Sequence, residues 1–126
     1  MKVTPTGDGR SFDVTSTDDK DHYVVDIMEN EGRGVCSCTD HRCRCQPKLN
    51  RGDKAITYSN THTRTQCKHI DKLIKFFGLT VLRTLDTDTI ESLIEIHGDI
   101  NRVVEHLGIT VWCRLNNKQP TDLFEL

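Results

Sequence analysis

The chain has 126 residues, of which 35% are hydrophobic and 29% charged, and its formal net charge is only −2. This length suits one ordinary domain or two small modules. The modest supply of apolar side chains indicates that a small module needs a further cross-link, such as a bound metal ion, to be stable. No segment is long and apolar enough to span a membrane, and the first residues lack the apolar run of a signal peptide. We therefore expect a protein of the reducing cytoplasm, or of the host-cell cytoplasm or nucleoid if it is viral.

Charge is distributed unevenly along the chain. Residues 36–70 hold 7 basic and 2 acidic side chains, whereas the ranges 1–35 and 71–126 are both acidic in balance. A basic block of this kind is typical of a surface that faces phosphate groups, and an ordinary solvated loop is an equally good account. The block also contains five of the six cysteines. In a reducing compartment, clustered cysteines bind metal more often than they pair with one another.

The N-terminal part of the chain has the pattern of a β-hairpin. Residues 11–15 and 22–28 alternate apolar with polar side chains on either side of a polar turn at 18–21. This alternation predicts two strands with one buried face. That face would consist of Phe12, Val14, Tyr23, Val25 and Ile27. We expect residues 39–66 to be polar, basic and irregular, with a short strand at 55–58.

The hydrophobic period changes to that of a helix after residue 69. The predicted apolar face of this helix consists of Ile70, Leu73, Ile74 and Phe77, and Gly78 is its expected end. Three short helices are predicted beyond residue 87. Asp88 would cap the first and Asp99 the second, which Gly108 would end. Thr110 would cap the third, at about 111–117.

Two tight pairs of metal-ligating residues lie near the two ends of this basic block. The residues between the pairs, 39–66, are called the basic segment below. Cys36 and Cys38 form a C-x-C pair, and Cys67 and His69 form a C-x-H pair. Three thiolates and one imidazole are a recognised tetrahedral set for Zn2+. The first pair ends a predicted strand and the second begins a predicted helix, so one ion would join sheet to helix. Because the protein supplies all four ligands, we expect a structural site and not an enzyme.

The order of hairpin, C-x-C pair, C-x-H pair and helix resembles the SWIM zinc finger. The resemblance covers about residues 11–77 and rests on the four ligand residues, on Tyr23 to Asp26 before them, and on Ile70 to Phe77 after them. It implies a β-β-α fold around one zinc ion that is used to bind DNA or a protein partner. The chain departs from the family in the length of the loop between the pairs and in a further C-x-C pair inside that loop.

Cys43 and Cys45 form this further pair, and three interpretations of it stay open. They are structural or incidental thiols, they replace one of the two pairs as ligands, or they help to bind a second metal with His41 or His62. An all-thiolate site that attracts soft ions such as Cu(I) would consist of Cys36, Cys38, Cys43 and Cys45.

The run from His97 to Thr110 resembles the Fis-type helix-turn-helix, and the match covers about residues 88–118. In that family an H-G-(N/D) turn precedes a short helix, and L-G-I-(S/T) turns into the recognition helix. The resemblance implies that the third helix enters the major groove. The DNA-contact candidates on this side are Arg102, Thr110, Val111, Trp112, Arg114 and Lys118. Arg114 stands where the family has an apolar residue, and a lone tryptophan such as Trp112 is more commonly buried.

The basic segment adds further DNA-contact candidates, namely Arg42, Arg44, Lys48 and Arg51. The resulting fold prediction is α+β: a zinc-stapled β-β-α module at 1–78, followed by an all-α three-helix module at 79–126. The main hypothesis is a small intracellular zinc protein that binds nucleic acid as a prokaryotic or viral regulator or accessory factor.

The alternatives are a protein-interaction adaptor or inhibitor whose zinc only builds a rigid surface, and a protein for metal storage or delivery. A protein partner and a homodimer both stay open. The chain contains none of the common nucleotide-binding or hydrolase motifs, which is a further reason not to expect an enzyme.

Overall fold

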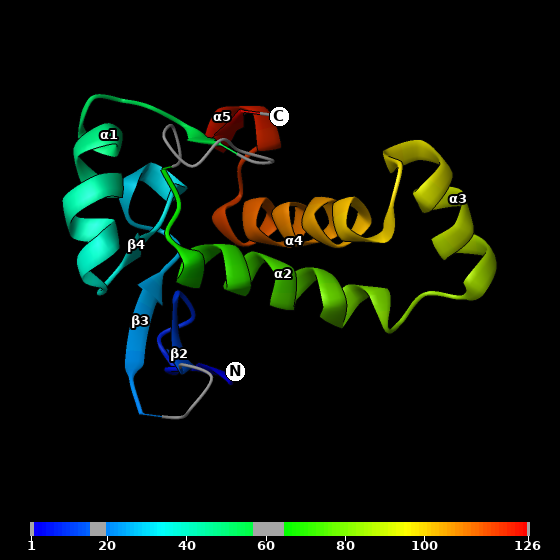
Figure 1. Ribbon diagram of the computed structural model, residues 1–126, viewed down its shortest axis with the longest axis horizontal. Coiled ribbons are helices and arrows are strands. Elements are labelled where there is room, and N and C mark those ends of the chain that lie inside the picture. The colour runs from blue at the N-terminus through cyan, green and yellow to red at the C-terminus, as the bar shows by residue number, and fades with distance from the viewer. Residues whose placement is uncertain (1, 16–19, 57–64, 126) are drawn as a thin grey trace.

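The structure, a computed structural model, describes residues 2–15, 20–56 and 65–125. A small antiparallel sheet is followed by helices, so the expected α+β class is confirmed. Helices α2 (Lys68–Leu82) and α4 (Ile100–Asn116) lie side by side, with the sheet at one end and α3 (Thr87–His97) at the other (Figure 1). The metal-ligating pairs therefore belong to the sheet end of the molecule.

The N-terminal sheet has four strands in the order β1-β2-β3-β4, and all its pairings are antiparallel. The strands are β1 (Val3–Pro5), β2 (Ser11–Thr15), β3 (His22–Asp26) and β4 (Val35–Cys36). The predicted hairpin is confirmed: Phe12 pairs with Val25, and Val14 pairs with Tyr23. Residues 16–19, which include the first half of the predicted turn at 18–21, lie outside the described residues. Strand β1 was not predicted, because three residues are too few for a periodic pattern.

The expectation that residues 39–66 are irregular is wrong for the first part of this range. A short π-helix, η2 (His41–Cys45), leads directly into α1 (Gln46–Asn50). His41, Cys45 and Leu49 are all buried and recur at four-residue spacing, which places them on one inner helix face. A pattern based on aliphatic residues misses such a face because two of its three members are histidine and cysteine.

The predicted strand at 55–58 is confirmed in its first half. Strand β5 (Ala55–Ile56) pairs in parallel with β6 (Phe124–Glu125), which follows the short helix α5 (Pro120–Leu123). Residues 57–64 lie outside the described residues. The C-terminal tail is thus docked through main-chain bonds beside the cysteine-rich segment.

Helix α2 continues through Gly78, and α4 continues through Gly108, so both expected helix ends are wrong. A Cβ atom on Gly78 would overlap the backbone carbonyl of Val104, and one on Gly108 would overlap the carbonyl of Ile74. The two glycines therefore allow α2 and α4 to cross in backbone contact. The turn of the predicted helix-turn-helix is absent, and its second and third helices are one helix.

The helix caps follow the expected chemistry at one position of three. Asp99 caps α4 by accepting a hydrogen bond from the Arg102 backbone N–H at 2.9 Å. The cap of α3 is Asp86, not Asp88, and it accepts from the Thr89 N–H at 2.8 Å. Thr110 caps nothing, because it lies inside α4.

One hydrophobic core joins the sheet to the helices. Its fully buried side chains come from the sheet and the following turn (Val14, Val25, Ile27), from α2 (Ile70, Leu73, Ile74) and from α4 (Trp112). The suggested module boundary after residue 78 falls inside α2, and residues from both sides of it enter this core. No helix among the described residues is long and apolar enough to cross a membrane.

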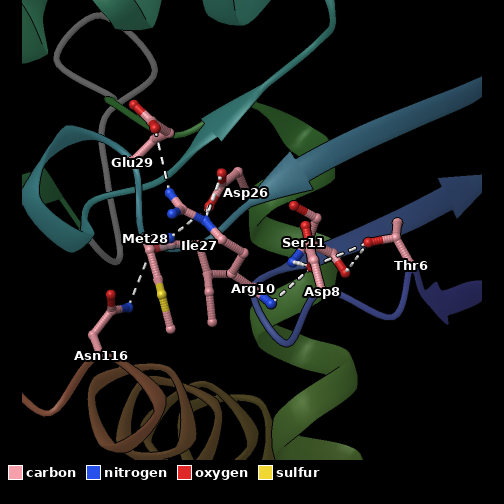
Figure 2. A network of polar contacts seen from close by, with 9 residues as sticks. All are labelled: Thr6, Asp8, Arg10, Ser11, Asp26, Ile27, Met28, Glu29 and Asn116. Atoms are coloured by element: carbon pink, nitrogen blue, oxygen red, sulfur yellow. Dashed lines mark hydrogen bonds and ion pairs between the residues drawn. The ribbon is translucent and has the colours of Figure 1, made fainter.

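A network of polar contacts fixes the turns around this core. The Arg10 guanidinium binds Asp26 at 2.9 Å and Glu29 at 3.3 Å, which ties the β1–β2 turn to the end of β3. Figure 2 shows this network and its link to α4, where the Asn116 amide donates to the Ile27 carbonyl at 3.1 Å. The segment that leads into β4 is thereby held from two sides.

Candidate metal centre

The four residues predicted as metal ligands come together in one buried group. Cys36 ends β4, Cys38 follows it, Cys67 is the N-cap of α2, and His69 lies in the first turn of that helix. Their ligand atoms all lie within 4.8 Å of one another. The Nδ1 atom of His69 is 3.7 Å from the Cys36 sulfur and 4.0 Å from the Cys67 sulfur.

These separations fit a tetrahedral ion. With bonds of about 2.0–2.3 Å to zinc, neighbouring donor atoms around a tetrahedron are about 3.3–3.8 Å apart, so only a small closing movement is needed. Three sulfur atoms and one imidazole nitrogen are also the donor set that borderline-soft ions such as zinc prefer. The geometry therefore supports a metal site, and zinc as the particular metal stays a prediction from the donor chemistry.

Backbone N–H groups orient two of the sulfur atoms. The Cys67 sulfur accepts from the Ile70 N–H at 3.5 Å, as an N-cap side chain does, and the positive end of the helix dipole favours its thiolate form. The Cys38 sulfur accepts from the His41 N–H at 3.3 Å, at the start of η2. Each ligand pair is thus held at the beginning of a helix.

The three thiol groups differ in their pKa values. A hydrogen bond from Cys36 lowers the pKa of Cys67 to about 5, and the same bond raises the pKa of Cys36. Burial raises the pKa of Cys38. At neutral pH the group thus holds one ready thiolate, and an incoming ion must displace the protons of the other two thiols.

Tyr23 packs against the histidine ligand. The two rings are stacked with centroids 4.0 Å apart and an interplanar angle of 27°. This contact holds the His69 ring in place from β3, as residues packed behind a ligand do in metal sites. Sequence reasoning placed Tyr23 on the buried face of the hairpin but could not assign its partner, because that depends on how α2 docks on the sheet.

Cys43 and Cys45 stay outside the ligand group, and the structure separates their roles. Cys43 is exposed, whereas Cys45 is buried, and burial raises the pKa of Cys45 to about 12. Among the described residues, the only group with metal-ligand spacing is the one named above. The all-thiolate set and a replacement of either pair are therefore not assembled in this structure.

His41 is the second imidazole near the group. It is completely buried, and neither ring nitrogen makes a hydrogen bond of ordinary geometry in the described part of the chain. Burial lowers its pKa, and the Gly34 backbone beside the ring opposes this shift. His62, the other histidine considered for a second metal, lies outside the described residues.

The residues predicted to contact DNA differ in how far their side chains are exposed to solvent. Trp112 is completely buried, and its indole N–H donates to the Gly32 carbonyl at 2.7 Å, so it is not available to a base. Val111 is half-buried against the core. The exposed candidates are Arg42, Arg44, Arg51, Arg102, Arg114 and Lys118, and the half-buried ones are Lys48 and Thr110. Three of them (Thr110, Arg114 and Lys118) line one pocket.

Comparisons of the chain with protein-family models, with curated proteins and with solved structures found no match. The resemblances to a SWIM zinc finger and to a Fis-type helix-turn-helix therefore have no support beyond their residues. The buried group of three cysteines and one histidine rests on its own geometry.

Proposed function

We propose that the protein is a small zinc-stapled regulator or accessory protein that binds nucleic acid through its basic segment. One observation carries the proposal: the buried ligand pairs lie on either side of the basic segment in sequence and come together in space. A metal bound there would close this segment into a loop on the sheet. The role proposed for the metal is structural, because four protein ligands leave no coordination position for a substrate.

The basic segment offers accessible cations. Arg42 and Arg44 extend from η2 into solvent, and Arg51 follows α1. Arg44 pairs with Asp40 at 3.4 Å and Arg51 pairs with Asp53 at 3.0 Å. Exposed pairs of this kind contribute only about 0–1 kcal/mol, so a phosphate group can replace the carboxylate at little cost.

The test is a titration of zinc-loaded protein with a short DNA duplex and a single strand at several salt concentrations. Each lost phosphate contact should reduce the salt slope by about one unit, so Arg42→Gln/Arg44→Gln should reduce it by about two. Arg83→Gln, an exposed arginine at the end of α2, is the matched control and should change the slope little. The proposal fails if the protein shows neither binding nor a salt slope at low salt.

A protein-interaction adaptor is the second candidate, and α3 favours it. This helix has no buried residue, and Ile96 at its end is 74% exposed. An apolar side chain exposed to this degree offers a partner an anchor, and the second candidate rests on this residue. Capture of a partner by the zinc-loaded protein, lost in Ile96→Ser with unchanged metal content, would support the adaptor over the regulator.

A further inference from the structure

A shallow polar pocket lies where α4 ends and the chain turns into α5. Its volume is about 330 Å3, which is at the lower limit for small-molecule sites. Its lining includes Thr110, Cys113, Arg114, Asn117, Lys118 and Gln119. None of these residues belongs to the metal group or to the basic segment, so the pocket is a feature of its own.

Two cations without partners dominate the pocket electrostatically. Arg114 and Lys118 are both exposed, and neither side chain has an ion pair or hydrogen bond within the described ranges. One acidic group, Asp122, acts on the pocket residue Cys113 through its charge, although burial contributes more to the raised pKa of that thiol. Asp122 is itself held by the Gln119 N–H at 3.1 Å. The lining therefore keeps a positive balance.

The C-terminal end of a helix ordinarily repels anions, but here that effect is small. The helix dipole amounts to about half a negative charge, against two full positive charges from the arginine and the lysine. The carbonyls of Cys113 and Arg114 are also occupied, because they accept from the Lys118 N–H at 3.0 Å and the Asn117 N–H at 3.1 Å. The pocket consequently presents cations and no free carbonyl from these two residues.

Thr110 gives the pocket a second chemical preference. Its hydroxyl donates to the His106 carbonyl at 2.9 Å, so its proton is already used. The remaining lone pairs of this oxygen can only accept, which suits a hydroxyl group of a ligand. A ligand with an anionic group for Arg114 and Lys118 and a neighbouring hydroxyl for Thr110 has the chemistry of a phosphorylated sugar.

We propose that this pocket binds a phosphorylated sugar, such as that of a nucleotide, with its phosphate on Arg114 and Lys118 and a sugar hydroxyl on Thr110. Arginine supplies paired N–H donors that match phosphate oxygens, and lysine supplies a point charge. The nucleotide is either free or one unit of a nucleic-acid chain, since both carry the same groups. The pocket does not depend on the nucleic-acid contact proposed for the basic segment.

The test follows backbone amide NMR signals of the zinc-loaded protein during titration with inorganic phosphate, with AMP and with a hexanucleotide. We expect AMP to shift the signals of residues 110–120. Arg114→Gln/Lys118→Gln should weaken AMP binding at least about tenfold, because both charge-assisted contacts are lost. Thr110→Val should weaken the binding of AMP, and it should leave the already weaker binding of inorganic phosphate unchanged. Arg42→Gln/Arg44→Gln is the control and should leave AMP binding unchanged.

The proposal is overturned if none of the three probes shifts these signals, or if the Arg114/Lys118 double variant binds them as the wild type does. Tighter binding of AMP than of the hexanucleotide would identify a free nucleotide as the ligand, and the reverse would identify a nucleic-acid chain. Loss of DNA binding in the Arg42/Arg44 variant with AMP binding intact would show that the two sites are separate. Zinc content and circular dichroism check that each variant is folded.

Discussion

The indole N–H of Trp112 donates a hydrogen bond of 2.7 Å to the carbonyl of Gly32, a residue 80 positions earlier in the chain. The contact is buried, and the ring leaves no space beside the turn: a Cβ atom on Gly34 would lie 2.7 Å from it. Asn116, one helical turn later, donates to the carbonyl of Ile27 (Figure 2). Helix α4 thus holds the turn that leads directly into β4 and Cys36.

Replacing the tryptophan should therefore destabilise the whole molecule. Trp112→Phe removes the only hydrogen-bond donor of the ring and leaves a cavity, and we expect a loss of about 3 kcal/mol in the free energy of unfolding. Urea unfolding followed by circular dichroism measures it. Leu115→Ala, at an exposed position on the same helix, is the control and should change stability by less than about 1 kcal/mol. Equal effects of the two substitutions would contradict a role for the contact.

The helix crossing makes a second prediction. Alanine at either Gly78 or Gly108 places a Cβ atom against the backbone of the opposite helix, so α2 and α4 must move apart. Overpacking of this kind costs about 1–3 kcal/mol, although alanine is the better helix former. Thr80→Ala, at an exposed position of α2, keeps the helix-propensity effect without the clash and should be neutral or stabilising. Urea unfolding of the three variants separates the two effects.

Much of the sheet end was predictable because its signals are local. The alternation around Phe12 and Val25 and the spacing of Cys36, Cys38, Cys67 and His69 each depend on a few neighbouring residues. The four ligand residues meet in space because one pair lies at the end of a strand and the other at the start of the helix that packs beside it. The spacing of the two pairs was sufficient to predict this. The contact of Tyr23 with His69 and the burial of His41 depend on docking, and no local pattern reports them.

The helical end shows the opposite result, and its glycines explain why. Gly78 and Gly108 interrupt helical patterns, and an interrupting glycine is commonly interpreted as a helix end. The same residue type is also required where two helices touch through their backbones, and the choice between these uses depends on the partner helix. The sequence likeness to a helix-turn-helix came from this ambiguity: Gly108 lies at the crossing and not at a turn.

Metal content tests the ligand assignment. We expect about one zinc ion per chain in the wild type, and loss of zinc together with unfolding of the sheet end in Cys67→Ser, because Cys67 is a proposed ligand and also the N-cap of α2. Elemental analysis after exhaustive dialysis, combined with circular dichroism, measures both. A zinc content that is unchanged in Cys67→Ser would remove the assignment.

The two remaining loop cysteines provide matched controls that the structure distinguishes. Cys43→Ser changes an exposed thiol and should keep both zinc and stability. Cys45→Ser places a hydroxyl at a buried position, so it should keep zinc but lose about 1–3 kcal/mol of stability. More than one bound ion in the wild type, reduced by the Cys43→Ser change, would support the second-metal interpretation instead.

Acid should release the metal, because its ligands bind in their deprotonated forms. The hydrogen bond from Cys36 lowers the pKa of Cys67 to about 5, below the ordinary value of a thiol. A lowered pKa contributes stability that is fully present above the ordinary thiol pKa and is lost as the pH falls through about 5. This contribution belongs to the metal-free protein. In the loaded site protons compete with the ion for all three thiolates and the imidazole, so zinc release should increase as the pH falls.

A colorimetric zinc indicator that tolerates acid can follow the release, and Cys36→Ala provides the comparison. This variant loses one of the four proposed ligands and therefore binds zinc more weakly, so its release should begin at a higher pH than that of the wild type. Tyr23→Leu keeps all four ligands but removes the ring stacked on His69, and its shift should be smaller. Equal release profiles of the wild type and Cys36→Ala would contradict the assignment of Cys36 as a ligand.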